Sequence, residues 1–90
     1  MSEPLKLPAR LDLSAANDLV ESLRKVEGDI LLDASEVSHL GALCLQSLVA
    51  ASRKASANGH KFQMDGASDK VLEQMKYMGA TPDQLAEGTI

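Results

Sequence analysis

Three short apolar segments have the length and pattern of β-strands. Leu5 to Leu7 lies between two prolines, which suit strand ends and edges because proline donates no ladder hydrogen bond. Ile30 to Leu32 is an uninterrupted apolar run, typical of a central strand that is buried on both faces. Lys61 to Met64 alternates polar with apolar residues, so we expect a half-buried strand whose Phe62 and Met64 point to the core.

Helical spacing dominates the stretches between and after these strands. Ser14 is an N-cap candidate for a first helix that Gly28 ends. Good helix formers and no proline from Gly41 to about Asn58 predict a second helix. A third helix is predicted from the caps Ser68 and Asp69 to Gly79, with Val71, Leu72, Met75 and Met78 on one face, and Thr81-Pro82-Asp83 predicts a short fourth.

Strands that alternate with helices predict an α/β fold. We expect about three to four mostly parallel strands packed with three to four helices, in a single domain that spans residues 1–90. Such a small sheet has exposed edges, which are either covered by helices and termini or used for a partner or a second copy of the chain. A polar segment, Ser35 to Leu40, links the central strand to the second helix, where open α/β sheets usually present their working surface.

Composition narrows the classes of function. The net charge is −4, the nine Lys and Arg residues form no block, and Phe62 and Tyr77 are the only aromatic residues, which argues against nucleic-acid binding. No apolar stretch approaches the roughly 18 to 20 residues of a membrane span, and the N-terminus lacks the apolar region of a signal peptide, so we expect a cytoplasmic protein. Cysteine and histidine show no metal-ligand spacing, and we expect no cofactor.

A few side chains have chemistry that an enzyme would use. Cys44 is a candidate nucleophile at a helix start, but its apolar neighbours favour a small buried core residue. His39 is a candidate phosphate ligand or phosphoryl carrier, and an exposed histidine with neither role is the simpler interpretation. Asp33 and Glu36, with Ser35 between them, offer a pair of carboxylates for acid–base chemistry, although Asp33 and Ser35 are better explained by a turn bonded to the local backbone. Because no nucleophile, base and orienting group fall together, we do not expect an enzyme.

The run from Ile30 to Leu48, ILLDASEVSHLGALCLQSL, resembles the core of the STAS domain, the family of the anti-sigma-factor antagonists. The Asn58-Gly59 turn, the Phe62 strand and the helix from Asp69 to Met78 also fall where that family places them. The Leu40 to Cys44 segment is similar to that of small STAS proteins from alphaproteobacterial chemotaxis operons. The resemblance therefore implies a STAS-like fold and a regulatory role.

Phosphoregulated members of the family carry a pattern such as Asp-Ser-Ser-Gly at the start of the second helix, and a kinase phosphorylates the residue after the Asp. The resemblance places Gly41 at the Asp, Ala42 at the phosphoacceptor, Leu43 at the small residue and Cys44 at the Gly. Ala42 has no hydroxyl, so the usual phosphorylation site is absent. A shift of two or three residues would instead bring Ser38 into play.

We therefore expect a non-catalytic module that binds a signalling protein, a histidine kinase of a chemotaxis-like system. A STAS subunit that binds the ATPase of a phospholipid-transport complex is one alternative, and a conventional antagonist phosphorylated at Ser38 is another. A thiol-dependent or phosphatase-like enzyme is the third. The expected partner contacts lie at the strand-to-helix corner and along the second helix: Ser38, His39, Leu40, Gly41, Ala42, Leu43, Gln46, Ser47, Ala50 and Arg53.

Overall fold

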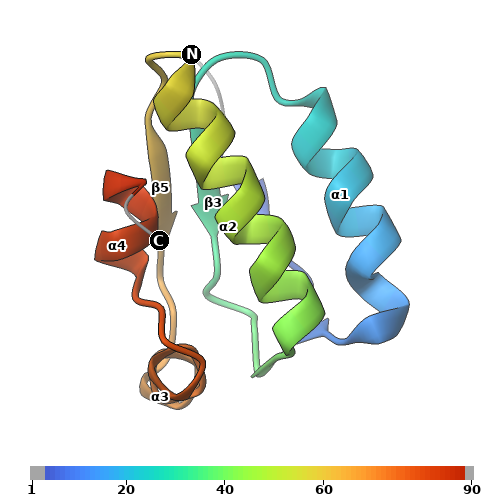
Figure 1. The fold of residues 1–90 in the computed structure, drawn as a ribbon. Helices are drawn as coiled ribbons and strands as arrows, with labels where there is room; N and C mark the ends of the chain where they lie inside the picture. The colour runs from blue at the N-terminus through green and yellow to red at the C-terminus, as the bar shows by residue number, and fades with distance from the viewer. Residues whose placement is uncertain (1–3, 89–90) are drawn as a thin grey trace.

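The computed structural model describes residues 4–88 of the chain. Its strands are β1 (Leu5–Lys6), β2 (Arg10–Leu11), β3 (Ile30–Asp33), β4 (His39–Leu40) and β5 (Phe62–Asp65). Its helices are the 3-10 turn η1 (Leu13–Ala15) and the α-helices α1 (Ala16–Lys25), α2 (Ala42–Ala57), α3 (Asp69–Tyr77) and α4 (Pro82–Glu87). Figure 1 follows these elements in chain order from blue to red. The predicted α/β class is confirmed.

The main sheet has the order β1-β3-β5, and both pairs of strands are parallel. Ile30 to Leu32 is therefore the central strand, as predicted, and Leu5 to Leu7 lies at an edge. Phe62 and Met64 are buried, as their alternation indicated. They are in register with Ile30 and Leu32, which are buried on the same face.

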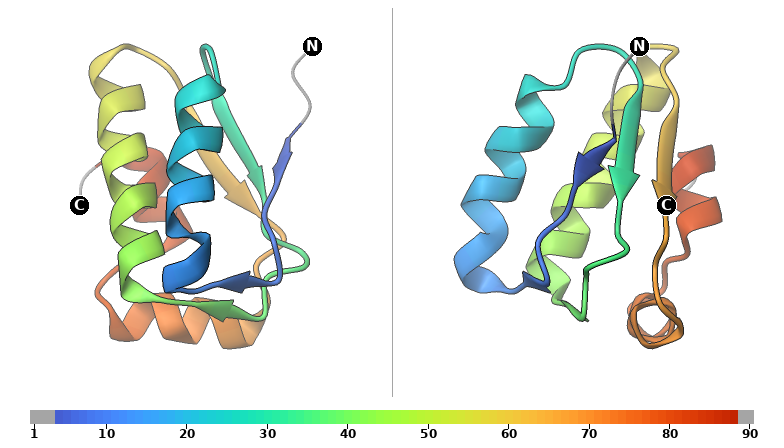
Figure 2. Two further views of the ribbon diagram at one scale, coloured as in Figure 1. Left: turned by 90° about the vertical axis from the view of Figure 1, so that its right-hand side faces the viewer. Right: turned by 180° about the vertical axis from the view of Figure 1, so that it is seen from behind.

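The prediction that the central strand is buried on both faces is wrong. Leu31 is only half-buried and is paired with the exposed Gln63. These two side chains point to the opposite face of the sheet from Ile30 and Phe62, and no helix within residues 4–88 covers that face. Figure 2 shows α1 and α2 together on one side of the sheet. A parallel sheet normally shows burial on both sides; here the polar alternation in β5 keeps the open face partly hydrophilic.

The remaining helices close the ends of the structure. In the views of Figures 1 and 2, α3 lies across one end of the sheet and α4 lies beside β5. Val71, Met75 and Leu85 from these helices are fully buried, which confirms that Met75 belongs to the core. Leu72 is an exception to the predicted apolar face of α3, because its side chain is 37% exposed.

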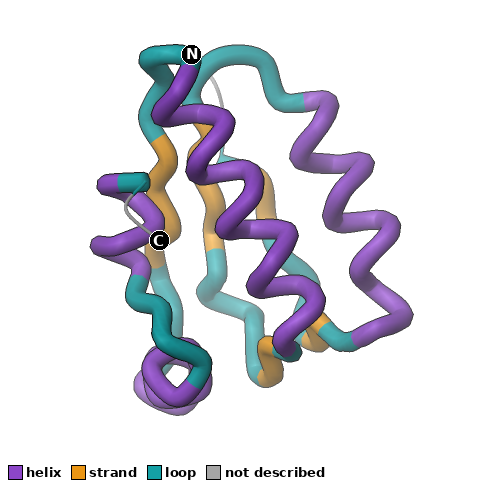
Figure 3. Tube along the Cα trace, viewed as in Figure 1, coloured by secondary structure: helices purple, strands orange, loops and turns teal. Residues whose placement is uncertain are grey.

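A second, two-stranded sheet joins two segments that the sequence pattern did not identify as strands. Arg10 and Leu11 in β2 pair in parallel with His39 and Leu40 in β4. The segment from Ser35 to Leu40 is therefore only partly a loop. In Figure 3 this small pair lies at the end of the molecule where α2 begins.

Two of the predicted helix caps are present, and the one predicted at Ser14 is not. The Ser68 hydroxyl accepts a hydrogen bond from the Val71 N–H, and the Thr81 hydroxyl accepts one from the Gln84 N–H, so both residues are N-caps. Ser14 does not cap the first helix. Asp12 has that role at η1, since its carboxylate accepts bonds from the N–H and the hydroxyl of Ser14.

Candidate functional site

The corner between β4 and α2 is held by the small β2–β4 sheet. Leu11 is in register with Leu40, and the Gly41 N–H donates to the Leu11 carbonyl oxygen over 2.8 Å. The next residue is Asp12, and its backbone carbonyl oxygen accepts a hydrogen bond from the Cys44 thiol. Two segments thirty residues apart in sequence therefore lie side by side, and Asp12–Leu13 flanks the first turn of α2.

Helix α2 begins without a side-chain cap. Gly41 is its N-cap in an extended conformation, and within residues 4–88 no side-chain capping bond is made to this helix start. A Cβ atom at Gly41 would lie 3.3 Å from the Leu11 carbonyl oxygen, tighter than most Cβ contacts, so a small residue suits this approach of two backbones. Ala42, the first helical residue, is exposed.

Most of the predicted contact residues reach the surface. Ser38, Ala42, Leu43, Gln46, Ala50 and Arg53 are exposed, and His39, Gly41 and Ser47 are half-buried. The prediction that Leu40 contacts a partner is wrong. Its side chain is 2% exposed, because it packs into the core, so it cannot touch a partner directly. Its N–H donates to the Gln74 side-chain oxygen over 2.8 Å, which ties the corner to α3.

Leu13 belongs to the same corner, although no pattern in the sequence selects it. Its side chain is 77% exposed, more than that of Leu43 at 46%. Alternating Leu11-Asp12-Leu13 looks like an extended segment, and only the start of η1 turns Leu13 outward beside α2. We define the docking corner as Leu13, Ser38, His39, Gly41, Ala42 and Leu43.

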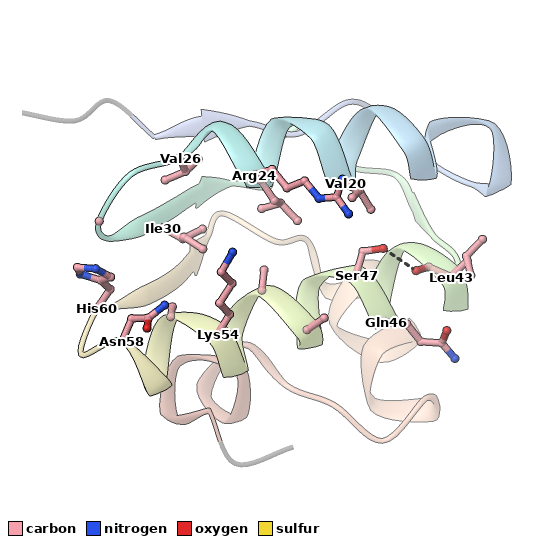
Figure 4. Close-up of a pocket in the computed structure, with 15 residues that line it drawn as sticks. Val20, Arg24, Val26, Ile30, Leu43, Gln46, Ser47, Lys54, Asn58 and His60 are labelled. Atoms are coloured by element: carbon pink, nitrogen blue, oxygen red, sulfur yellow. Dashed lines mark hydrogen bonds between the residues drawn. The ribbon is translucent and has the colours of Figure 1, made fainter.

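A groove leads from the docking corner along the space between α1 and α2 (Figure 4). Its volume is about 610 Å³. Leu43, Gln46, Ser47 and Ala50, all predicted contacts, line it. The opposite wall comes from α1, including Val20 and Arg24. Sequence reasoning assigned no part of α1 to the partner contact surface, because contact between the two helices depends on how both pack on the sheet.

The residues with enzyme-like chemistry have structural roles. Cys44 is fully buried, and burial, with a smaller contribution from the Asp12 charge, raises the pKa of its thiol. Asp33 forms the predicted turn, since its carboxylate accepts the Ser35 N–H over 2.9 Å. The Ser35 side chain, and then its backbone N–H, lower the pKa of Asp33. Glu36 forms an exposed ion pair with Lys6 at 3.4 Å.

The described residues contain neither a metal-ion site nor a membrane-spanning helix. Among residues 4–88, no three or more His, Cys, Asp or Glu side chains cluster so that they could hold a metal ion. In the same part of the chain, every helix is too short or too polar to cross a membrane.

Comparison with known proteins gives one match. The model of the family described as "Mlab, STAS domain" matches residues 2–85. No curated protein and no solved structure matches the chain significantly. The matched range includes β2, β4 and α2, the three elements that build the docking corner.

Proposed function

Because the chain belongs to the STAS domain family, whose domains act through protein–protein contacts, we propose that it binds a histidine kinase of a chemotaxis-like system in the bacterial cytoplasm. Domains of this family are generally non-catalytic binding modules. The contact surface in this proposal is the docking corner together with Gln46, Ser47, Ala50 and Arg53 on α2.

The observation that carries the proposal is the exposure of two leucines beside the start of α2. Leu13 and Leu43 are among only four large apolar side chains that are substantially exposed in residues 4–88, and both belong to the docking corner. Exposed leucines on two elements that contact each other, η1 and α2, are candidate contacts for another protein. The frame of the docking corner is firm, since β2, β4, α2 and α3 are joined by hydrogen bonds from Gly41, Cys44 and Leu40.

Position 42 of this corner lacks the hydroxyl that a kinase would phosphorylate. Ala42 occupies the first helical position, which supports the register that places it at the phosphoacceptor. A phosphate at a helix start would bring close to two negative charges and strong acceptors. Without a hydroxyl the chain stays in its unmodified form, and its expression level or the state of its partner sets the association.

Two alternatives within the same family use the same surface. In one, the docking corner binds the ATPase of a phospholipid-transport complex. In the other, Ser38 is phosphorylated. The Ser38 hydroxyl donates to the Ala9 carbonyl oxygen over 3.1 Å and precedes the N-cap by three residues, so it lies outside the helix start. This position favours the proposal over phosphorylation at Ser38.

The proposal is tested by affinity capture from the native host with three tagged chains: wild type, Ala42→Glu and Ala57→Glu. Glu at position 42 places a charge on the corner, yet suits the helix dipole, so the fold should be kept. Ala57 is exposed at the other end of α2, so Ala57→Glu makes the same change in net charge away from the docking corner and serves as the control for charge. Circular dichroism checks that each variant is folded, and quantitative mass spectrometry identifies what is captured.

We expect a histidine kinase to be enriched by wild type and Ala57→Glu, and to be reduced at least tenfold with Ala42→Glu. Equal kinase capture by folded Ala42→Glu would remove the docking corner from the proposal. Enrichment of a transporter ATPase without any kinase would favour the first alternative. Incubation of the purified kinase, ATP and the chain should leave the chain unphosphorylated, and phosphate on Ser38 would favour the second.

A further inference from the structure

The groove between α1 and α2 is long and shallow. Along α2 it extends from Leu43 to Asn58, which is about 22 Å at the rise of an α-helix. Ser47, Ala50 and Ala51 form the middle of this wall, and such small side chains let another backbone approach closely. A cylinder of about four helical turns would match this length.

Charge in the groove is opposite to that of the chain as a whole. The chain has 13 acidic and nine basic residues, yet the fifteen lining residues include the cations Arg24 and Lys54 and no carboxylate, although the lining His60 lies 3.9 Å from the Asp29 carboxylate. Arg24 from α1 and Lys54 from α2 both project into the space between the helices (Figure 4). Within residues 4–88 neither forms an ion pair or a side-chain hydrogen bond. The groove is thus ready for an anionic occupant.

Apolar side chains form the rest of the groove. Val20 and Val26 are half-buried, Ile30 is buried, and Leu43 is shared with the docking corner. An occupant therefore needs an apolar stripe as well as negative charge. An amphipathic helix with apolar residues at positions i, i+3, i+4 and i+7, flanked by carboxylates, presents both along one side.

We propose that the α1–α2 groove binds an acidic amphipathic helix of the partner protein, with its apolar stripe on Val20, Val26 and Leu43 and its carboxylates on Arg24 and Lys54. This inference rests on the proposed function, since it takes the occupant to be a protein. It extends the contact from the docking corner along the whole length of α2. The groove and the corner are tested separately.

A simpler role for the two cations is to offset helix dipoles. Arg24 and Lys54 each lie in the last turn of a helix, where positive charge is favourable. Lys25 occupies the same turn of α1 but does not line the groove, and Lys70 lies on α3. Lys25 and Lys70 therefore serve as controls that change the charge of the chain without changing the groove.

The test is an NMR titration of the full chain with synthetic fifteen-residue peptides. One peptide carries leucines at helical spacing with glutamates elsewhere, and a second has lysines in place of the glutamates. Decanoate is the third probe and tests whether the groove binds a small anionic amphiphile instead of a helix. Each probe is added to wild type, to Arg24→Glu/Lys54→Glu and to the control Lys25→Glu/Lys70→Glu, two double variants with the same change in net charge.

The acidic peptide should shift the amide signals of residues 20–26 and 43–58, with a Kd that rises about tenfold in Arg24→Glu/Lys54→Glu and little in the control. Equal weakening in both double variants would overturn the proposal, because only overall charge would then matter. Equal binding of the lysine peptide, or shifts caused by decanoate and not by the acidic peptide, would also overturn it. Kinase capture tests the docking corner independently of these results.

Discussion

The Cys44 thiol donates a hydrogen bond to the Asp12 carbonyl oxygen over 3.3 Å, and this contact joins the first turn of α2 to the segment that follows β2. The contact spans 32 positions in the sequence. It places the single cysteine inside the frame of the docking corner rather than on its surface. A residue that looks like a nucleophile in the sequence is therefore part of what supports the contact surface.

We expect the Cys44 thiol to be unreactive in the folded protein. The side chain is fully buried and its pKa is raised, so little thiolate is present and reagents cannot reach it. Labelling by a disulfide reagent should be slow in buffer and at least a hundredfold faster in unfolding concentrations of urea, measured by absorbance. Labelling of folded protein at the rate of an exposed thiol would contradict this placement.

Gln74 should stabilise the corner from α3. Its side-chain oxygen accepts the N–H of Leu40, so Gln74→Ala leaves that donor without its partner. Loss of a partner for a poorly solvated N–H lowers the free energy of unfolding by about 1–3 kcal/mol. Urea denaturation measures the loss, and faster hydrogen exchange at Leu40 locates it. The neighbouring exposed Glu73 provides the control, and a Glu73→Ala variant that loses as much would show that truncation of any polar side chain on α3, not loss of this bond, is responsible.

Gly88 should tolerate a side chain less well than Gly59, although both have positive φ. Alanine at either position takes up a left-handed conformation that costs about 1–2 kcal/mol. At Gly88 the new Cβ would also lie 2.7 Å from the Ser56 Cβ, whereas at Gly59 it meets open space. Gly88→Ala should therefore lower the melting temperature further, because α4 is pushed away from α2.

The Ser56→Gly variant separates strain from contact at this position. It removes the Cβ that Gly88→Ala would meet, so Gly88→Ala should be less destabilising in the Ser56→Gly background than in wild type. Additive losses in this double-mutant cycle would show that the two residues do not interact.

Asp33 should make stability depend on pH in the acid range. Its pKa is below the ordinary 3.8, first because of the Ser35 side chain and then because of the Ser35 N–H. A lowered pKa in the folded state contributes stability that is present above the unfolded pKa and is lost as pH falls through the folded pKa. Asp33→Asn and Ser35→Ala should each flatten the acid limb of a urea-denaturation series, and an NMR titration of the Asp33 carboxyl group reads the shift directly. A carboxyl group that titrates at its ordinary pKa would contradict the prediction.

Local sequence patterns predicted the main elements because their causes are local. The buried positions of β5, the caps Ser68 and Thr81, and the length of α2 follow from side-chain periodicity and hydrogen bonding within a few residues. The error at Leu31 has a different origin. An apolar run signals burial, but only the placement of α1 and α2 on the same side of the sheet leaves one face open.

The candidate site was predicted in part. Ala42, Leu43 and Gln46 were selected from their place at the start of α2, and they are exposed. Leu40 was wrongly included because a two-residue strand gives almost no periodicity from which to tell its buried face. Leu13 and the α1 wall of the groove were missed, since each reaches the site through pairing or packing with residues far along the chain.

The sequence by itself determined the order of the main strands and helices, the α/β class, the burial of Cys44 and the absence of a hydroxyl at position 42. Those properties depend on residue identity and on neighbours a few positions away. Tertiary structure alone decided that β2 pairs with β4, that Leu13 stands beside the start of α2, and that Arg24 and Lys54 face one groove. The physical reason is that each of these relationships joins separate segments, whose meeting depends on the packing of the whole core.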